Sequence, residues 1–225
     1  LSTGDEILDS KTDTKKISEG LLFDCNRPLL ASLVSKWGCE VLDLGVEKDN
    51  YNSIKSKLNY ASKYCDVLLT SGGASAGEAD FLSRMIKDEG ELYEWRIAIK
   101  PGRPLSLGLW NNMPIFGLPG NPVAAFVCSL IFFYPSISLM GGAGWQEPLK
   151  FQVFSNFTKK KRSGRKEYLR AKINSEGMVD VFKSEGSGRI SGLSWSTGLV
   201  ELPEESLEVT KGDNVNYIPY SNYGI

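Results

Sequence analysis

The feature that most constrains the fold of this chain is a predicted strand that passes through a glycine-rich turn into a helix. Residues 67–69 are an apolar run without polar alternation, as expected of a strand buried on both faces. A turn with three glycines follows at residues 71–77, and a helical pattern then runs over residues 81–90. This arrangement points backbone N–H groups and the positive end of a helix at an anion, most often a phosphate.

A second predicted strand ends at Pro119 and is followed by an apolar helix. Gly120 lets a ligand approach the backbone, Asn121 can cap the helix, and Pro122 suits a first helical position. In an open parallel sheet, the loops at the carboxyl ends of the strands share one edge, where ligands bind. We therefore expect this turn and the turn at residues 71–77 to be neighbours, with amide groups free to bind a ligand that carries more than one phosphate.

Composition argues against several classes of function. The chain has 225 residues, with 26 Lys and Arg against 27 Asp and Glu, so no bulk attraction for nucleic acid or anionic lipid is expected. The four cysteines are spread singly, without zinc or redox spacing, which is typical of reduced thiols in a cytoplasmic protein. The apolar stretch 123–140 is interrupted by serines and Pro135, which favours a buried helix over a membrane span.

The order of predicted elements indicates two domains. Residues 1–146 alternate between strands and helices, which predicts a doubly wound α/β domain with a mostly parallel sheet. Residues 147–225 contain short strands, which predict a small all-β barrel or sandwich. In the first domain we expect helices near 24–38, 54–61 and 81–90, a helix from 123, and strands at 39–44, 67–69, 95–100, 105–110 and 113–118, with a hairpin turn at 111–112. In the second we expect strands at 151–154, 168–173, 179–182 and 214–218.

Three acidic residues each follow a predicted strand: Glu6, Asp49 and Asp80. They are expected to converge on the ligand-binding edge of the sheet. Carboxylates repel phosphates unless a divalent cation lies between them, and Mg²⁺ is typically held by one or two carboxylates together with substrate oxygens. These three residues are therefore candidate metal ligands. The alternative for Asp49 and Asp80 is that each caps the helix that follows it.

Two cations precede a rigid turn at residues 101–102. Arg96 and Lys100 would face the same way on one extended strand, which indicates a dianionic substrate; a solvated strand face is the alternative. The basic run at residues 159–162 has little interleaved aromatic character and is interpreted as a solvated loop. The segment 186–188 is consistent with a simple turn as well as with a site.

The chain contains no histidine, so it lacks the commonest general base and the commonest metal ligand. Residues 73–77 match the G-x-S-x-G pattern of serine hydrolases, but the serine of that pattern needs a histidine to accept its proton. Ser75 is therefore interpreted as a hydroxyl group of an anion-binding loop. A tight turn that binds nothing is the alternative.

Four segments occur in the order and approximate spacing of the molybdopterin molybdenumtransferases, a family that includes bacterial molybdenum-insertion enzymes and the E domain of gephyrin. The segments are 2–6 (STGDE), 71–80 (SGGASAGEAD), 100–104 (KPGRP) and 117–123 (GLPGNPV). The chain also resembles the C-terminal β domain of that family at residues 164–170 and 186–188. The resemblance implies a molybdopterin-binding α/β fold followed by a barrel-like β domain.

The resemblance also implies an activity, namely the insertion of molybdate into adenylylated molybdopterin, which releases AMP and requires Mg²⁺. It gives catalytic and metal-binding roles to Glu6, Asp49 and Asp80, and catalytic roles to Arg96 and Lys100. In a homodimer, Arg170 and Ser187 would reach the pterin site of the neighbouring protomer. The cradle for the pterin phosphates would comprise Ser71, Gly72, Gly73, Ser75, Gly77, Pro119, Gly120 and Asn121.

The chain departs from the family pattern in three respects. Arg96 stands where bacterial members often have lysine, and Ala74 and Ala76 stand where valine is usual. The abrupt start at Leu1 predicts a fragment that lacks the family's N-terminal domains, with a natural terminus as the alternative. A fragment alone would bind without turnover, and an upstream adenylyltransferase is an expected partner. Two other functions stay open: molybdopterin adenylyltransferase, and a non-catalytic scaffold like gephyrin.

Overall fold

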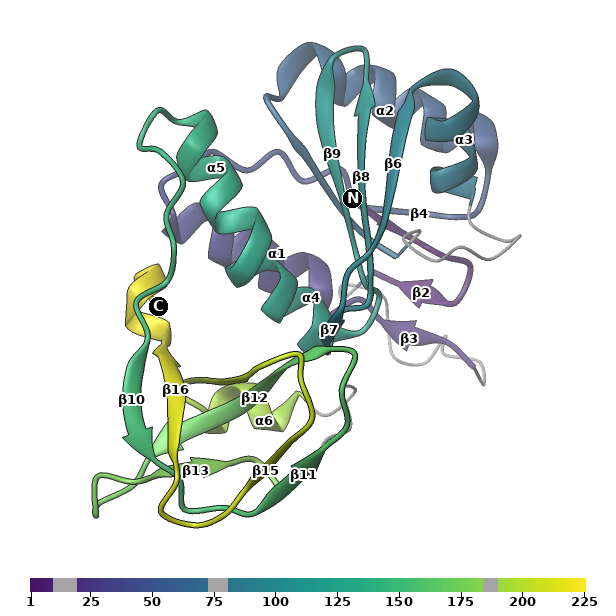
Figure 1. The fold of residues 1–225 in the computed structure, drawn as a ribbon. Helices are drawn as coiled ribbons and strands as arrows, with labels where there is room; N and C mark the ends of the chain where they lie inside the picture. The colour runs from purple at the N-terminus through teal and green to yellow at the C-terminus, as the bar shows by residue number, and fades with distance from the viewer. Residues whose placement is uncertain (10–19, 73–80, 184–189) are drawn as a thin grey trace. The chain divides into compact units, whose positions relative to one another are not determined.

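The structure is a computed structural model that describes residues 1–9, 20–72, 81–183 and 190–225 (Figure 1). The chain divides into two compact units. The first comprises residues 1–97 and 104–121, and the second comprises residues 98–103 and 122–225. The domain boundary between residues 146 and 147 rests on sequence character and stays a prediction.

Within the described residues, the first unit is built on a six-stranded sheet in the order β4-β1-β5-β9-β8-β6. Its strands are β1 (Ser2–Thr3), β4 (Val46–Glu47), β5 (Leu68–Ser71), β6 (Glu91–Arg96), β8 (Pro104–Trp110) and β9 (Met113–Leu118). Strands β4, β1, β5 and β9 pair in parallel, and β8 pairs antiparallel with both of its neighbours. The mostly parallel α/β sheet is therefore confirmed. The short strands β2 (Ile7–Leu8) and β3 (Leu22–Phe23) pair separately.

The helices of the first unit are α1 (Asn26–Lys36), α2 (Tyr51–Tyr64) and α3 (Phe81–Glu89). Figure 1 shows α2 and α3 beside each other over the strands, and their apolar faces share one core with Ile115 of β9. The connection from β1 to β4 crosses the sheet in the opposite direction to the connection from β4 to β5. Because such crossovers are right-handed, α1 lies on the face opposite α2, as a doubly wound sheet requires.

Two strand predictions are wrong in their bounds. No strand forms at residues 39–44, where Val41 and Leu42 are exposed, and β4 begins only after Gly45 has turned the chain with a φ of 81°. The strand predicted at 95–100 ends at Arg96, and β7 (Ile99–Lys100) pairs instead with a strand of the second unit. The predicted hairpin turn is confirmed, since Asn111 and Asn112 have positive φ values of 49° and 64°.

One helical segment opens the main part of the second unit. It runs as α4 (Pro122–Cys128), a π-helical turn η2 (Ser129–Phe133) and α5 (Tyr134–Met140). Pro135 cannot donate a backbone hydrogen bond, and it is the second residue of α5, just after the π-helical turn. Among the described residues, this 19-residue segment is long and apolar enough to cross a membrane, but 56% of its apolar window is buried, as in the core helix of a soluble protein.

The second unit also contains a five-stranded antiparallel sheet in the order β10-β16-β14-β12-β13. Its strands are β10 (Phe151–Phe154), β12 (Lys166–Ile173), β13 (Val179–Val181), β14 (Gly198–Leu202) and β16 (Asn214–Pro219), and β7 pairs in parallel with β12. Within the described chain, the edge strands of this sheet are linked by a single isolated bridge between Ser155 and Val179. A closed barrel therefore stays a prediction.

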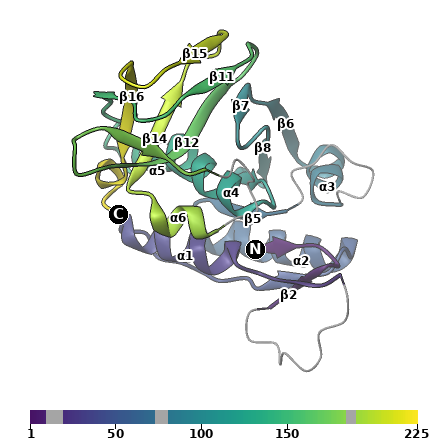
Figure 2. The same ribbon diagram turned by 90° about the horizontal axis from the view of Figure 1, so that it is seen from below.

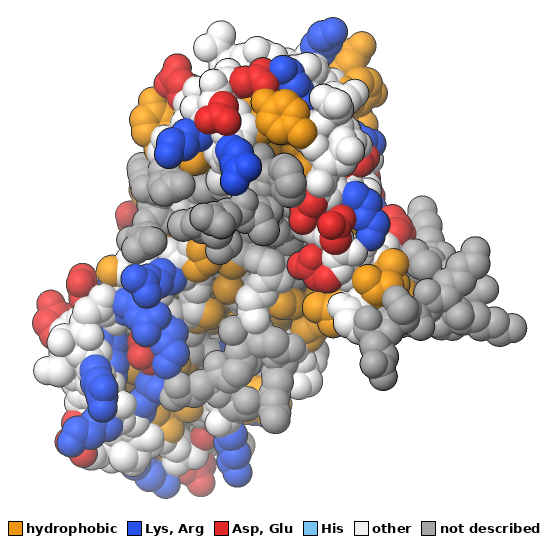
Figure 3. Space-filling model, turned by 90° about the vertical axis from the view of Figure 1, so that its right-hand side faces the viewer, with side chains coloured by type: hydrophobic (Ala, Val, Ile, Leu, Met, Phe, Trp, Pro, Cys, Tyr) orange, Lys and Arg blue, Asp and Glu red, His pale blue; other side chains and the backbone are white. Residues whose placement is uncertain are grey.

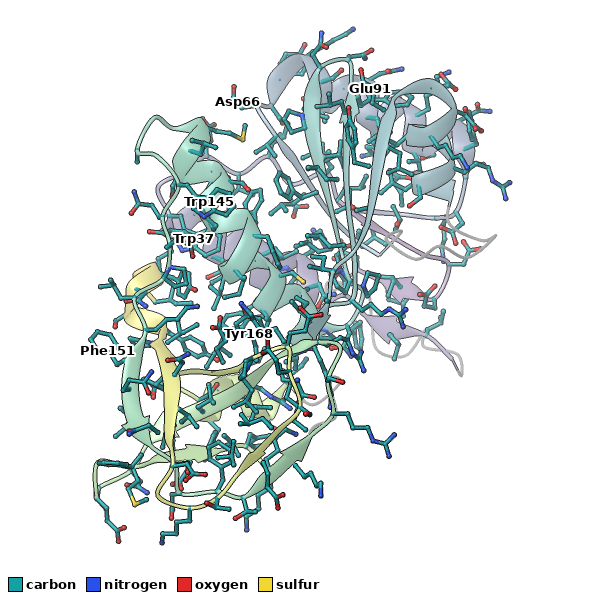
Figure 4. All side chains as sticks on the ribbon, in the orientation of Figure 1. Trp37, Asp66, Glu91, Trp145, Phe151 and Tyr168 are labelled. Carbon is teal, nitrogen blue, oxygen red and sulfur yellow. The ribbon has the colours of Figure 1, made fainter. Side chains whose placement is uncertain are left out.

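Three further strands were not expected from the sequence. They are β14 and the pair formed by β11 (Lys159–Lys161) and β15 (Leu207–Val209), which Figure 2 shows together. Strand β14 is buried along its whole length, and its Glu201 accepts a hydrogen bond of 3.0 Å from the hydroxyl of Tyr168, labelled in Figure 4. The short helix α6 (Ser191–Trp195) and the 3-10 turn η3 (Tyr220–Tyr223) complete the unit.

Candidate functional site

The carboxyl ends of β1, β5 and β9 lie side by side in the first unit. The N–H group of Gly72 donates a hydrogen bond of 3.3 Å to the carbonyl oxygen of Leu118. A Cβ atom added to Gly120 would lie 3.9 Å from the Cα atom of Gly72. The turns after β5 and β9 are therefore neighbours, as the sequence predicts for two ligand-binding loops.

A residue that the sequence analysis did not assign to the site joins these two turns. The side-chain nitrogen of Asn26 donates hydrogen bonds of 2.7 Å to Ser71 Oγ and of 2.7 Å to the carbonyl oxygen of Gly120. Cys25 is the N-cap of α1, and Asn26 is its first residue. The sequence holds one indication of this role. Asn26 lies on the same helical face as Leu30 and Leu33, and a polar side chain on a buried face needs a hydrogen-bond partner.

The backbone at the start of the glycine turn is fixed by the sheet. Gly72 has a φ of 86°, and a Cβ atom there would lie only 2.6 Å from the carbonyl oxygen of Thr3, so only glycine fits. The N–H groups of Ser71 and Gly72 donate to the carbonyls of Leu1 and Leu118. The expectation of free amides is therefore wrong for these two residues. Four residues of the predicted turn and metal site lie outside the described residues: Gly73, Ser75, Gly77 and Asp80.

Acidic side chains gather at the ends of β1 and β4. The N–H group of Asp49 donates a hydrogen bond of 3.2 Å to Asp5 Oδ1. Burial raises the pKa of the Asp49 carboxyl, and the charges of Asp5 and Glu6 raise it further. Glu6 and Asp49 are thus brought together as expected, with Asp5 as a third acid that the sequence analysis missed. Within the described part of the chain, no three acidic, cysteine or histidine side chains are arranged to hold a metal ion.

The two predicted cations do not share one strand. Arg96 is the last residue of β6 in the first unit, and Lys100 ends β7 in the second. The argument that both face the same way on one extended strand is therefore wrong, because the chain leaves the first sheet at residue 97. The side chain of Arg96 lies outside what is described. Lys100 Nζ lies 3.5 Å from Oε1 of Glu167.

Arg170 of β12 belongs to the interior of the second unit. Its guanidinium lies over the ring of Phe182 at 4.9 Å from the ring centre, and burial lowers its pKa. Ser187 lies outside the described residues, so the expectation that Arg170 and Ser187 reach the pterin site of a neighbouring protomer stays a prediction. In the second turn Pro119 is buried, Asn121 is half-buried, and Pro122 is the first residue of α4, as predicted.

The fold and the turns resemble those of known proteins. Residues 1–138 match a family described as "Probable molybdopterin binding domain", and residues 156–220 match the "MoeA C-terminal region (domain IV)". The chain is 35% identical over 227 residues to a molybdopterin molybdenumtransferase of Haemophilus influenzae, covering 99% of this chain and 55% of the relative. A molybdopterin molybdenumtransferase of Nostoc is 30% identical over 224 residues, covering 95% of this chain and 50% of the relative.

A solved structure is also similar to this chain. The crystal structure of a molybdopterin biosynthesis MoeA protein from Pyrococcus horikosii matches with a TM-score of 0.81 and 26% identity, covering 97% of this chain and 53% of that one. The chain thus spans about half the length of the curated relatives it matches.

The sheet, with two adjacent turns and a group of acids at its carboxyl edge, places the chain among α/β proteins that bind ligands at that edge. Because the first family matches more than half of the sequence, the chain belongs to the molybdopterin-binding domain family. The resemblance seen in the four sequence motifs is thereby confirmed.

Proposed function

We propose that the protein acts in molybdenum cofactor biosynthesis, where it inserts molybdate into adenylylated molybdopterin and AMP is released. The observation that carries the proposal is the junction of the Ser71 and Gly120 turns through Asn26, at the ligand edge of a molybdopterin-binding fold. The relatives named molybdopterin molybdenumtransferase support the same reaction.

The two turns would bind the phosphate end of the pterin. Gly120 is exposed, and a Cβ atom there would lie no closer than 3.9 Å to any described residue, so a phosphate oxygen can approach its backbone. Pro119 fixes the entry of the turn, and Asn121 adds a polar side chain beside it. Residues 73, 75 and 77 would complete the cradle from the other side. Catalysis would come from positioning and electrostatic stabilisation, with no covalent enzyme intermediate.

The acids at the sheet edge fit a hard divalent cation such as Mg²⁺. Burial and then the charges of Asp5 and Glu6 raise the pKa of Asp49, so a cation beside it would relieve the repulsion, and carboxylate oxygens are the donors that Mg²⁺ prefers. Glu6 and Asp49 would hold the ion together with Asp80. An ion held there would offset the negative charge of the pyrophosphate group.

The predicted cations serve the second substrate. Lys100 and Arg96 would hold molybdate, a tetrahedral dianion, near the pterin dithiolene. We propose a cytoplasmic homodimer in which Arg170 and Ser187 complete the site of the neighbouring protomer, and an adenylyltransferase that supplies the adenylylated pterin.

The test is molybdate-dependent release of AMP from adenylylated molybdopterin by the native protein. The variants Asp80→Asn and Lys100→Ala should retain the wild-type circular dichroism spectrum and lose AMP release. Lys211→Ala removes a charge from an exposed turn of the second unit and should release AMP at the wild-type rate. Wild-type release by both site variants would rule the assignment out.

A further inference from the structure

A strongly cationic pocket lies within the second unit. It has a volume of about 300 Å³, and among the described residues that line it six are Lys or Arg and one, Glu167, is a carboxylate. Figure 3 shows Lys and Arg side chains gathered on one face of the molecule. The described residues that line the pocket all belong to the second unit.

The segment 159–165, which carries most of these cations, is anchored at Lys161. Lys161 is only 4% exposed, and its Nζ donates hydrogen bonds of 2.9 to 3.0 Å to the carbonyl oxygens of Arg162, Glu204 and Glu205. Strand β11 also pairs with β15 along its length. The interpretation of residues 159–162 as a solvated loop is therefore wrong, because Lys161 anchors the segment and fixes where its neighbours point.

Glu167 gathers two ammonium groups at the pocket. Its Oε1 lies 3.5 Å from Lys100 Nζ, and its Oε2 lies 3.3 Å from Lys159 Nζ, although the two lysines belong to different strands. Glu167 is 9% exposed, and among the described residues its Oε2 makes no hydrogen bond beyond this ion pair with Lys159. Glu167 is the one carboxylate among the described lining residues, against six Lys and Arg, so this part of the lining is rich in positive charge.

We propose that this pocket binds a doubly charged tetrahedral oxyanion, either free or as the terminal phosphate of a nucleotide. Lys100, Lys159, Arg162 and Arg165 supply the donors, and Glu167 is a positioning residue that holds the two lysines. A concave cluster of like charges focuses the potential and concentrates counter-ions of this kind. This proposal adds residues to the oxyanion site of the proposed function. It rests on the proposed function only for the identification of the anion as molybdate.

The experiment is calorimetric titration of the whole chain with sulfate, with molybdate and with AMP at low ionic strength. The double variant Lys159→Gln/Arg165→Gln removes two cations from the pocket, and Lys211→Gln removes an exposed lysine that does not line it. We expect the double variant to bind sulfate and molybdate at least about tenfold more weakly, since charge-assisted hydrogen bonds are lost. Binding by the wild type should weaken as salt is added.

The arms of the titration separate the possible sources of the anion. Tighter binding of AMP than of sulfate, lost in the double variant, assigns the pocket to a nucleotide phosphate, and the reverse order assigns it to a free oxyanion. Glu167→Gln should lower the affinity less than the double variant does, because the lysines stay charged. Equal affinity of wild type, double variant and control for every probe overturns the proposal.

The binding titration and the AMP-release assay can fail separately, so the two proposals can be told apart. If the wild type releases AMP from the adenylylated pterin but all variants bind sulfate and molybdate equally, the proposed oxyanion pocket is rejected and the proposed function is retained. If sulfate binding differs between the variants but the wild type releases no AMP, the oxyanion pocket is retained and the proposed function is rejected.

Discussion

Asn26 donates a hydrogen bond of 2.7 Å to Ser71 Oγ, and the same nitrogen donates a second one to the carbonyl oxygen of Gly120. One buried amide group thus ties the start of α1 to the ends of β5 and β9. These three segments lie far apart in the sequence. The position of the two turns relative to each other therefore depends on a residue that belongs to neither.

The first prediction concerns this amide. Asn26→Ala should lower the free energy of unfolding by about 1–3 kcal/mol, because Ser71 Oγ and the Gly120 carbonyl lose a buried partner. The control is Asn222→Ala, which removes a single hydrogen bond of 2.8 Å to the Leu149 carbonyl at an exposed site and should cost less than about 1 kcal/mol. Urea unfolding measures both. Equal losses in the two variants would contradict the linking role of Asn26.

The second prediction compares two glycines with nearly the same backbone conformation. Gly72 and Gly38 have φ values of 86° and 83°, but only at Gly72 would a Cβ atom meet backbone, at 2.6 Å from the Thr3 carbonyl oxygen. Gly38→Ala should cost about 1 kcal/mol from the φ value alone. Gly72→Ala should cost about 1–3 kcal/mol more, because backbone must move. Equal midpoints in urea would show that β1 and β5 are not held as described.

The third prediction follows from the raised pKa of Asp49. A group whose pKa is higher in the folded state than in the unfolded state favours folding when protonated, and this contribution is lost as pH rises through the folded-state pKa. Asp49→Asn should therefore be more thermally stable than wild type at neutral pH, and the difference should vanish in acid below the ordinary pKa of aspartate. Thermal melts across this range measure it.

Magnesium gives the matching control for that comparison. Millimolar Mg²⁺ should raise the melting temperature of the wild type at neutral pH and have a smaller effect on Asp49→Asn. The same rise in both proteins would exclude Asp49 as a ligand.

The fourth prediction tests the burial of α4. Cys128 is fully buried, and burial raises the pKa of its thiol to about 12, so almost no thiolate is present at neutral pH. In the native protein iodoacetamide should modify the half-buried Cys39 and leave Cys128 unmodified, whereas in urea both should react. Peptide mass spectrometry measures the two sites. Rapid native modification of Cys128 would show that this helix is not packed as described.

The sequence was most informative where one local pattern decides the structure. The apolar run that becomes β5, the hairpin at Asn111–Asn112 and the proline that opens α4 all follow from short-range rules. The adjacency of the Ser71 and Gly120 turns followed from the common edge of parallel strands.

The failures arose where distant partners decide the structure. Residues 39–44 have an apolar pattern but no strand forms, because the chain reaches the sheet only after Gly45. Lys161 reads as a surface lysine until the carbonyls of residues 204 and 205 are placed beside it. Asn26 likewise gains its role only when the ends of two strands meet it.

The most direct test of the central claim is an equilibrium titration of molybdopterin into the wild-type chain, Gly120→Val and Ala143→Val. Among the described residues, a Cβ atom at residue 120 would meet nothing closer than the Cα atom of Gly72 at 3.9 Å, so we expect valine to occupy the space beside the two turns and to leave the melting temperature unchanged. Ala143 is exposed in the second unit and serves as the control. We predict that Gly120→Val binds molybdopterin at least about tenfold more weakly than the other two proteins, and equal affinity in all three would contradict the account.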